Sequence, residues 1–328
     1  MNRILSLMAM AFMLLGVFSC QKYNNPEGPV EYEQVTFSVA SPDAVATKSI
    51  ASGNSATVLD FAVYYNGNYV STINPNQNAS VTEGVDENEN VTWEVVLTLV
   101  KNVSYDVVFW AHADNDVYEF DMEKATITVK DKYAGNANDD SRDAFYHCVT
   151  DYVASSVATD VYLTRPFAQI NFASSDYDPY ITDFDFDVDS RIACDSNDGA
   201  ASLSVPTVLN VLDGSVDEYV DLEFASTAVP YEGGDKVLVE LDGVVYHWMA
   251  MNYILAPETK STIDKVTATF TYNGCDLPVE VLNVPFRRNY KTNILGAFFS
   301  GSTEFNIQIL PGFAGTYSGS VEGGFDNN

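Results

Sequence analysis

Apolar and polar residues alternate along much of the chain, and a period of two is typical of half-buried β-strands. Val35-Thr36-Phe37-Ser38-Val39 shows this alternation in its simplest form. Further β-rich runs lie at residues 59–65, 69–73, 92–100, 105–113, 118–129, 160–172, 182–188, 219–224, 236–241, 244–251, 266–272, 277–281 and 305–310. Helical periods are rare, and the best helix candidates are the short segments 144–152 and 289–298. The pattern predicts an all-β fold of antiparallel strands.

Three local signals refine this prediction. Asn66-Gly67 separates two strand-like runs, and a type I′ hairpin turn needs positive φ at both of its central positions. Apolar residues occupy both faces of the run 105–113, so we expect both faces to be at least partly covered. Pro166 lacks a backbone donor, so the run 160–172 is expected to lie at a sheet edge or to start anew there.

The length of the chain favours two domains. Of its 328 residues, roughly 300 remain after the leader described below, about twice the usual size of a single domain. We therefore predict two tandem antiparallel β-sandwich domains, at residues 34–160 and 161–313. Residues 21–33 are polar and punctuated by proline, which predicts a tether. Residues 314–328 are rich in glycine and serine, which predicts a flexible tail.

Residues 1–20 predict export. A positive end at Arg3 precedes an apolar run that is too short to span a membrane. This run ends in Val17-Phe18-Ser19-Cys20, which is similar to a bacterial lipoprotein box in which Cys20 is acylated. The alternative is an ordinary secretory signal with a chance cysteine. Both interpretations predict that the protein leaves the cytoplasm.

Composition excludes some partners. The formal net charge is -30, from 46 acidic and 16 basic residues. Nucleic acid and anionic membrane surfaces are bound through clustered cations, which this chain lacks, so neither is an expected partner. Cys148, Cys194 and Cys275 are spaced too widely for a metal site, and they predict either one optional disulfide or three buried thiols.

Four aspartates alternate along one predicted strand, Asp183, Asp185, Asp187 and Asp189. Carboxylates on one face could hold calcium. A straight strand spaces such side chains roughly 7 Å apart, however, whereas calcium needs ligands that converge from a bent loop. We therefore favour a solvated outer face over a metal site.

No catalytic pattern stands out. The histidines His112, His147 and His247 lie in no metalloprotease motif, and neither a nucleophile elbow nor a phosphate-binding loop is present. Pairs of carboxylates serve glycoside hydrolases, but nothing in the sequence selects one pair among so many. We expect no enzyme activity, no metal and no cofactor.

Aromatic side chains offer one candidate for binding. Trp110 and Trp248 lie inside apolar runs, so core packing is the favoured interpretation for both. Trp93 is closer to a loop and is the better candidate for a glycan contact.

Several ordered segments resemble the fimbrillin superfamily, the pilin-like lipoproteins of Bacteroidales that build type V pili. The resembling segments are the lipoprotein box at Cys20, Ala46-Thr47-Lys48-Ser49, 105–111, Leu163-Thr164-Arg165-Pro166-Phe167-Ala168-Gln169-Ile170, 251–257 and Val284-Pro285-Phe286-Arg287-Arg288-Asn289-Tyr290-Lys291-Thr292-Asn293-Ile294-Leu295-Gly296 leading into 305–313. Their order and spacing extend along nearly the whole chain.

The resemblance implies two transthyretin-like β-sandwiches and assembly by donor-strand exchange. In that scheme a trypsin-like protease cuts the loop after the first strand, and a strand from the next subunit fills the groove that the departing strand leaves. The displaced strand here would present Val35, Phe37 and Val39, and the cut between Lys48 and Ser49 would follow a lysine rather than the arginine of the best-known members.

These observations predict a fimbrillin-like pilus subunit or adhesin, anchored by lipid to the cell outer membrane and exposed at the surface or in a fimbria. Its expected partners are other pilus subunits, through β-strand addition, and a host or bacterial surface protein or glycan. Because residues 314–328 have little β-forming sequence, the tail is expected to be a weak donor strand. The alternative is a cell-surface glycan-binding lipoprotein that does not polymerise.

Overall fold

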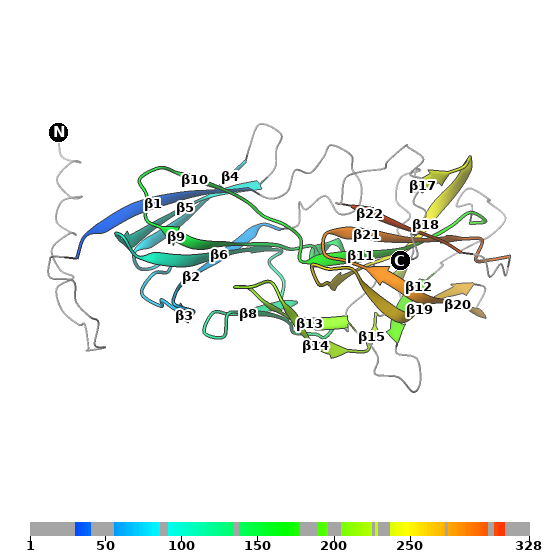
Figure 1. Ribbon diagram of the computed structural model, residues 1–328. Coiled ribbons are helices and arrows are strands. Elements are labelled where there is room, and N and C mark those ends of the chain that lie inside the picture. The colour runs from blue at the N-terminus through cyan, green and yellow to red at the C-terminus, as the bar shows by residue number, and fades with distance from the viewer. Residues whose placement is uncertain are drawn as a thin grey trace. The chain divides into compact units, whose positions relative to one another are not determined.

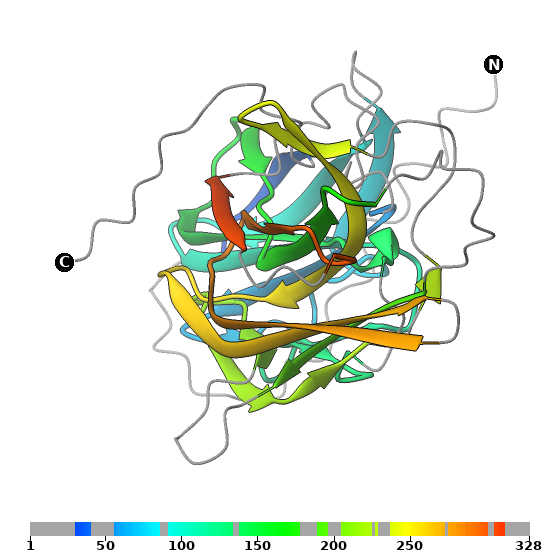
Figure 2. The same cartoon turned by 90° about the vertical axis from the view of Figure 1, so that its right-hand side faces the viewer.

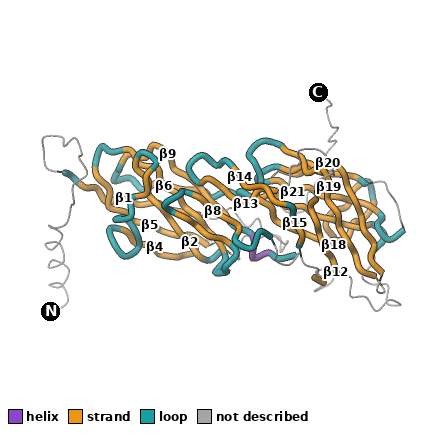
Figure 3. Tube along the Cα trace, turned by 90° about the horizontal axis from the view of Figure 1, so that it is seen from below, coloured by secondary structure: helices purple, strands orange, loops and turns teal. Residues whose placement is uncertain are grey.

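The computed structural model describes residues 30–40, 56–85, 91–133, 138–177, 189–195, 205–224, 227–228, 237–272, 275–300 and 305–311. The chain divides into two compact units, Met1–Glu31 and Tyr32–Asn328, and the description concerns the second. Its described residues form strands and loops, with a single 3-10 turn at η1 (Asp140–Arg142) (Figure 1, Figure 3). No helix in this described part has the length and apolar character needed to cross a membrane. The predicted all-β fold of antiparallel sheets is confirmed.

Two four-stranded sheets pack face to face around a first hydrophobic core. The β1 sheet has the order β10 (Thr159–Tyr162), β1 (Tyr32–Ala40), β5 (Val91–Val100) and β4 (Ala79–Val85). The β6 sheet has the order β3 (Asn68–Tyr69), β2 (Val58–Tyr65), β6 (Ser104–His112) and β9 (Phe145–Val153). Alternation produces this core directly, since Val95, Leu97 and Leu99 on β5 are completely buried.

The turn between β2 and β3 follows the sequence signal. Asn66 has a φ of 51° and Gly67 a φ of 74°, and Tyr64 pairs with Tyr69 across the hairpin. Asparagine and glycine tolerate these values better than other residues, so the type I′ prediction is confirmed.

The β6 sheet is covered on both faces, as its apolar residues predicted. Val107 and Phe109 face the first core, whereas Val108 and Trp110 belong to a second core. A further sheet contributes to that second core and has the order β14 (Val216–Val220), β13 (Val205–Asn210), β8 (Thr126–Val129) and β7 (Tyr118–Asp121). Its strands come from both sides of the boundary expected near residue 160, and the number of domains stays a prediction.

Two more sheets complete the second core (Figure 2). One has the order β17 (Val237–Leu241), β18 (Val244–Leu255), β11 (Phe167–Ser174), β21 (Tyr290–Gly296) and β22 (Asn306–Pro311). The other has the order β15 (Leu222–Glu223), β12 (Asp189–Asp195), β19 (Ser261–Tyr272) and β20 (Cys275–Phe286), with β16 (Thr227–Ala228) also paired to β12. All eight residues of β11 are buried, because this strand lies between β18 and β21 and both of its faces are covered.

The structure corrects the two helix candidates and confirms that the run 160–172 starts anew after Pro166. The helix candidates 144–152 and 289–298 are largely strands, β9 and β21, because pairing with β6 and β11 outweighs a weak local preference. The run 160–172 is two strands, since β10 ends before Pro166 and β11 starts anew at Phe167. Three of the four alternating aspartates, Asp183, Asp185 and Asp187, lie outside the described residues.

A buried ion pair fixes the chain where β10 leads into β11. The Arg165 guanidinium donates to both carboxylate oxygens of Asp143, with Nε–Oδ1 at 2.7 Å and Nη2–Oδ2 at 2.8 Å. It also lies over the Phe145 ring, 4.6 Å from its centre. Burial raises the pKa of Asp143, while Arg165 acts in the opposite direction and favours the charged carboxylate. Removing one partner would leave an uncompensated buried charge.

Lys291 on β21 belongs to the same polar cluster. Burial and the Arg165 guanidinium lower the pKa of Lys291 to about 8, while Asp143 and Asp140 act in the opposite direction. Because this pKa is below its usual value of 10.5, the folded protein bears the cost of a buried ammonium at neutral pH.

We expect Lys291→Met to raise the free energy of unfolding at pH 7 by about 1–3 kcal/mol, since a neutral side chain of similar length removes that cost. The cost is complete below about pH 8 and fades as the pH rises toward 10.5, because the folded-state pKa is the lower one. The stability difference between variant and parent, measured by urea unfolding from pH 7 to pH 10, should therefore shrink. Lys265→Met is the control for loss of a lysine, and a constant difference for Lys291→Met would contradict the prediction.

Candidate functional site

The first strand, β1, lies inside its sheet and is hydrogen-bonded on both sides. It pairs antiparallel with β5 over its whole length. On its other side, Phe37–Ala40 pair in parallel with Thr159–Tyr162 of β10 (Figure 1). The backbone N–H of Leu163 then donates to the carbonyl of Ala40, at 3.1 Å. These ladders satisfy backbone groups that would otherwise need another partner.

The inner face of β1 supplies part of the first core. Val35 and Phe37 are completely buried, and Val39 is 1% exposed. The Phe37 ring lies between two aromatic neighbours, with centre-to-centre distances of 5.2 Å to Phe109 and 4.8 Å to Tyr152. Burying these three side chains is worth about 5–9 kcal/mol relative to leaving them in water. Removing the strand without a replacement would therefore forfeit this burial energy.

Strand β10 depends on β1. It is the edge strand of the sheet, and within the described part of the chain its ladder partner is β1. Val161 and Leu163 anchor it in the core, and Tyr146 and Thr164 exchange backbone hydrogen bonds just beyond its end. Loss of β1 would remove every strand pairing of β10 described here while leaving these anchors in place.

Three of the predicted site residues form the buried face of β1. Alternation placed Val35, Phe37 and Val39 on one side, and the structure buries all three there. That this strand is displaced stays a prediction. The lipidation residue Cys20 and the cleavage residues Lys48 and Ser49 lie outside the described residues.

The structure corrects the expectation for Trp93. Its indole is only 3% exposed and packs in the first core, because β5 begins two residues earlier and alternation turns Trp93 inward with Val95. A sugar ring therefore has no access to its face. Trp110 and Trp248 are also buried, as their apolar surroundings predicted.

His112, His147 and Cys148, whose side chains could take part in chemistry, are each partly buried. His112 Nε2 lies 3.1 Å from Asp60 Oδ2, and burial lowers the pKa of His147. Burial also raises the pKa of the Cys148 thiol to about 12, which disfavours the nucleophilic thiolate. No group of three or more metal-ligating side chains occurs among the residues that the structure describes.

Sequence reasoning missed β10 as the neighbour of β1. The pairing joins residues 37–40 to residues 159–162, and no local pattern encodes a partner that far along the chain. Asp160 and Tyr162 alternate with the buried Val161, so their exposure was readable, but their position beside β1 was not.

Residues 27–325 match the model of a family described as a family of unknown function, DUF6562. The chain belongs to the DUF6562 family. A comparison with curated proteins gives no match.

Several solved structures from Bacteroides are similar to this DUF6562 chain. One is a candidate cell adhesion protein of Bacteroides uniformis ATCC 8492, with a TM-score of 0.47, 12% identity, and coverage of 84% of this chain and 97% of that one. A candidate adhesin of Bacteroides thetaiotaomicron VPI-5482 has a TM-score of 0.44, 10% identity, and coverage of 87% and 97%. A candidate cell adhesion protein of Bacteroides ovatus ATCC 8483 has a TM-score of 0.44, 12% identity, and coverage of 87% and 99%.

We expect Phe37→Ala to lower the free energy of unfolding by about 3–5 kcal/mol, because it removes a buried ring and leaves a cavity between Phe109 and Tyr152. Equilibrium unfolding in urea would measure the loss. The matched control is Gln34→Ala on the exposed outer face of the same strand, which should change stability by no more than about 0.5 kcal/mol. A loss below about 1 kcal/mol for Phe37→Ala would show that β1 is not an integral part of the core.

Proposed function

We propose that this protein is an exported, lipid-anchored subunit of a surface fibre or an adhesin of the fimbrillin type. It is acylated at Cys20, cut between Lys48 and Ser49, and assembled by exchange of β1 for a strand of another subunit. The resemblance of the ordered sequence segments to fimbrillins supports this proposal, as does the apolar leader that ends at Cys20.

The position of β1 is the observation that carries the proposal. A strand that is paired on both sides and buries three alternating side chains leaves, when removed, a slot with an exposed β5 edge and an apolar floor. Such a slot matches the mode of recognition in which an added strand gains affinity from main-chain hydrogen bonds and specificity from side-chain pockets. Lys48 follows β1 by only eight residues, so a cut there would separate the strand from the rest of the chain.

The slot defines its occupant. A donor must run antiparallel to β5 and, at its end, parallel to β10. It must also carry apolar side chains at three alternate positions, with the largest in the middle where Phe37 now lies between Phe109 and Tyr152. Polar or charged residues at those positions would be buried without partners.

Strand exchange can be tested on the mature chain with a site-specific protease sequence inserted between Lys48 and Ser49. After cleavage, a fluorescent peptide with the sequence of residues 32–40 should be incorporated, because it can refill the slot left by β1. A matched peptide with Phe37→Ala should bind at least about 100-fold more weakly, the equivalent of about 3 kcal/mol. Fluorescence anisotropy and size-exclusion chromatography would measure both.

The uncleaved protein is the control and should take up neither peptide, since its own strand occupies the slot. Incorporation of both peptides to the same extent would mean that the side-chain pockets do not select the donor. Retention of the cut strand with no peptide uptake would rule out exchange.

Maturation is tested by the mass and N-terminal sequence of protein from the native outer membrane and from sheared surface material. We expect sheared material to contain a chain that begins at Ser49. A Lys48→Ala variant should retain the form acylated at Cys20, whereas Lys101→Ala, at a lysine outside this loop, should mature normally. Sheared material that contains only acylated Cys20 chains would contradict proteolytic maturation.

A glycan-binding lipoprotein that does not polymerise is the second candidate function. It no longer has the support of Trp93, whose ring is buried. Tyr162, an exposed tyrosine on β10 next to β1, supports this second candidate function instead.

A further inference from the structure

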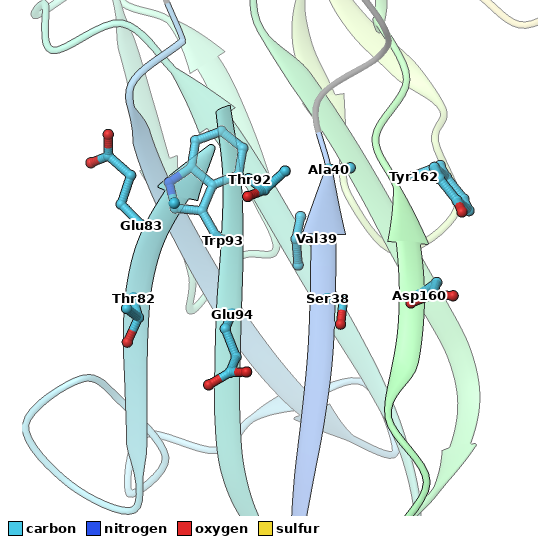
Figure 4. A pocket seen from close by; sticks show the side chains of 11 residues that line it. Ser38, Val39, Ala40, Thr82, Glu83, Thr92, Trp93, Glu94, Asp160 and Tyr162 are labelled. Atoms are coloured by element: carbon cyan, nitrogen blue, oxygen red, sulfur yellow. The ribbon is translucent and has the colours of Figure 1, made fainter. Parts of the chain in front are cut away.

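The outer face of the β1 sheet contains a hollow of about 440 Å³ near the end of β1. Four neighbouring strands, β4, β5, β1 and β10, run side by side beneath it (Figure 4). We call this feature the outer trough. Val39, Glu83 and Trp93 also line it. Val39 and Trp93 are buried in the first core, and the remaining lining residues except Glu83 alternate with them and belong to the opposite, outer face of the sheet.

Strand register arranges the trough in two rows across the sheet. The first row is Thr82, Glu94, Ser38 and Asp160, and Figure 4 shows these four side chains at one level of the strands. The second row, two residues further along each strand, is Gly84, Thr92, Ala40 and Tyr162. Neighbouring strands are about 4.8 Å apart and the rows about 7 Å apart, so the trough is wide enough for one or two sugar rings.

The trough is hollow because its second row contains two very small residues. Gly84 has no side chain, and a Cβ built there would meet Thr92 Oγ1 at 3.4 Å, an ordinary contact. Its backbone needs no positive φ, so a larger residue could occupy this position without strain. Ala40 adds only a methyl group. The recess therefore results from the small side chains at these two positions and not from an unusual backbone conformation.

An aromatic ring forms one wall of the trough. Tyr162 is 70% exposed, although tyrosine usually buries most of its ring. The strand that carries it is held by the inward-facing Val161, which is 2% exposed, so the ring is presented from an ordered position. An exposed tyrosine next to small residues offers a flat apolar face to a ligand.

The remaining groups are hydrogen-bonding partners for hydroxyls. Glu94 and Asp160 flank Ser38 in the first row, and Thr82 and Thr92 add two further hydroxyls. Carboxylates form strong charge-assisted hydrogen bonds with hydroxyl donors. These two carboxylates and the formal net charge of -30 repel anionic ligands. Sialylated sugars, sulfated sugars and uronic acids are therefore disfavoured.

We propose that the outer trough binds a neutral pyranose of a surface glycan. The apolar face of the sugar stacks on Tyr162, and its hydroxyl groups donate to Glu94 and Asp160. A few fixed polar groups beside an apolar wall are the usual composition of a small-molecule site. This binding needs no strand exchange and so goes beyond the proposed assembly mechanism.

The trough also couples binding to β1. Ser38 and Ala40 are part of that strand, and Asp160 and Tyr162 lie on β10, whose strand pairing depends on it. A sugar that binds only the intact sheet stabilises the state in which β1 is in place. At ten times its Kd, it should reduce the population of β1-released protein about 11-fold. This effect of the sugar on the release of β1 rests on the proposed strand exchange.

The test is a glycan array of neutral and anionic sugars with the mature protein, followed by calorimetric titration of the best neutral binder. We expect a neutral glycan to bind with a Kd below about 1 mM, typical of one stacked ring with a few hydrogen bonds. Tyr162→Ala and Gly84→Leu should each weaken binding at least 10-fold, by removing the wall and by filling the recess. Tyr162→Phe, which keeps the ring, should retain binding within about 3-fold.

Two matched controls should bind as the parent does. Tyr219→Ala removes an exposed tyrosine from β14, and Ser80→Leu adds the same bulk to the same face of β4, about 13 Å from Gly84. Circular dichroism would establish that each variant is folded. If Gly84→Leu fails to fold, Glu94→Gln with Asp160→Asn serves in its place and should give the same loss.

Three results would overturn the proposal. In the first, the protein binds no neutral glycan; in the second, it binds only anionic sugars; in the third, it still binds the neutral glycan after both Tyr162→Ala and Gly84→Leu. The peptide-uptake assay is independent of these results. If no neutral glycan binds but the peptide is taken up, only the glycan proposal is wrong. If a neutral glycan binds but the peptide is not taken up, only the strand-exchange proposal is wrong.

Discussion

The burial of Val35, Phe37 and Val39 is the interaction on which the N-terminal core depends. These side chains fill the space between the β1 and β6 sheets, and the backbone that carries them completes the ladder between β5 and β10. A single short strand thus supplies core volume and hydrogen bonds at once. If β1 were displaced, as proposed, a strand of the same pattern could satisfy both exposed edges.

The β6 sheet connects this core to the rest of the described structure. Its alternate residues face two different cores, so Phe109 contacts Phe37 on one side while Trp110 packs with Tyr118 on the other. Beyond β10, the Arg165–Asp143 ion pair fixes the chain before β11 begins. Neither the Trp110–Tyr118 contact nor the Arg165–Asp143 ion pair involves a side chain of β1, so both contacts could persist if β1 were displaced.

The two faces of β1 have different chemistry. The inner face is apolar and fits a slot, and the outer face contributes Ser38 and Ala40 to a hydrophilic trough walled by Tyr162. The proposed assembly would use the first face and the proposed glycan binding the second. Because one strand contributes to both, occupancy of the trough would oppose release of the strand.

Features that depend only on neighbouring residues can be predicted from the amino-acid sequence. Alternation identified β1 and β5 and the apolar side of β1, and Asn66-Gly67 identified a hairpin, because strand period and turn geometry are local properties. Tertiary structure decided the rest. It made strands of 144–152 and 289–298, turned Trp93 into the core, and brought Tyr162 beside Ala40. Those outcomes depend on pairing between segments that are distant in the sequence. The energy of such pairing outweighs local conformational preference, and the sequence of either segment alone does not reveal its partner.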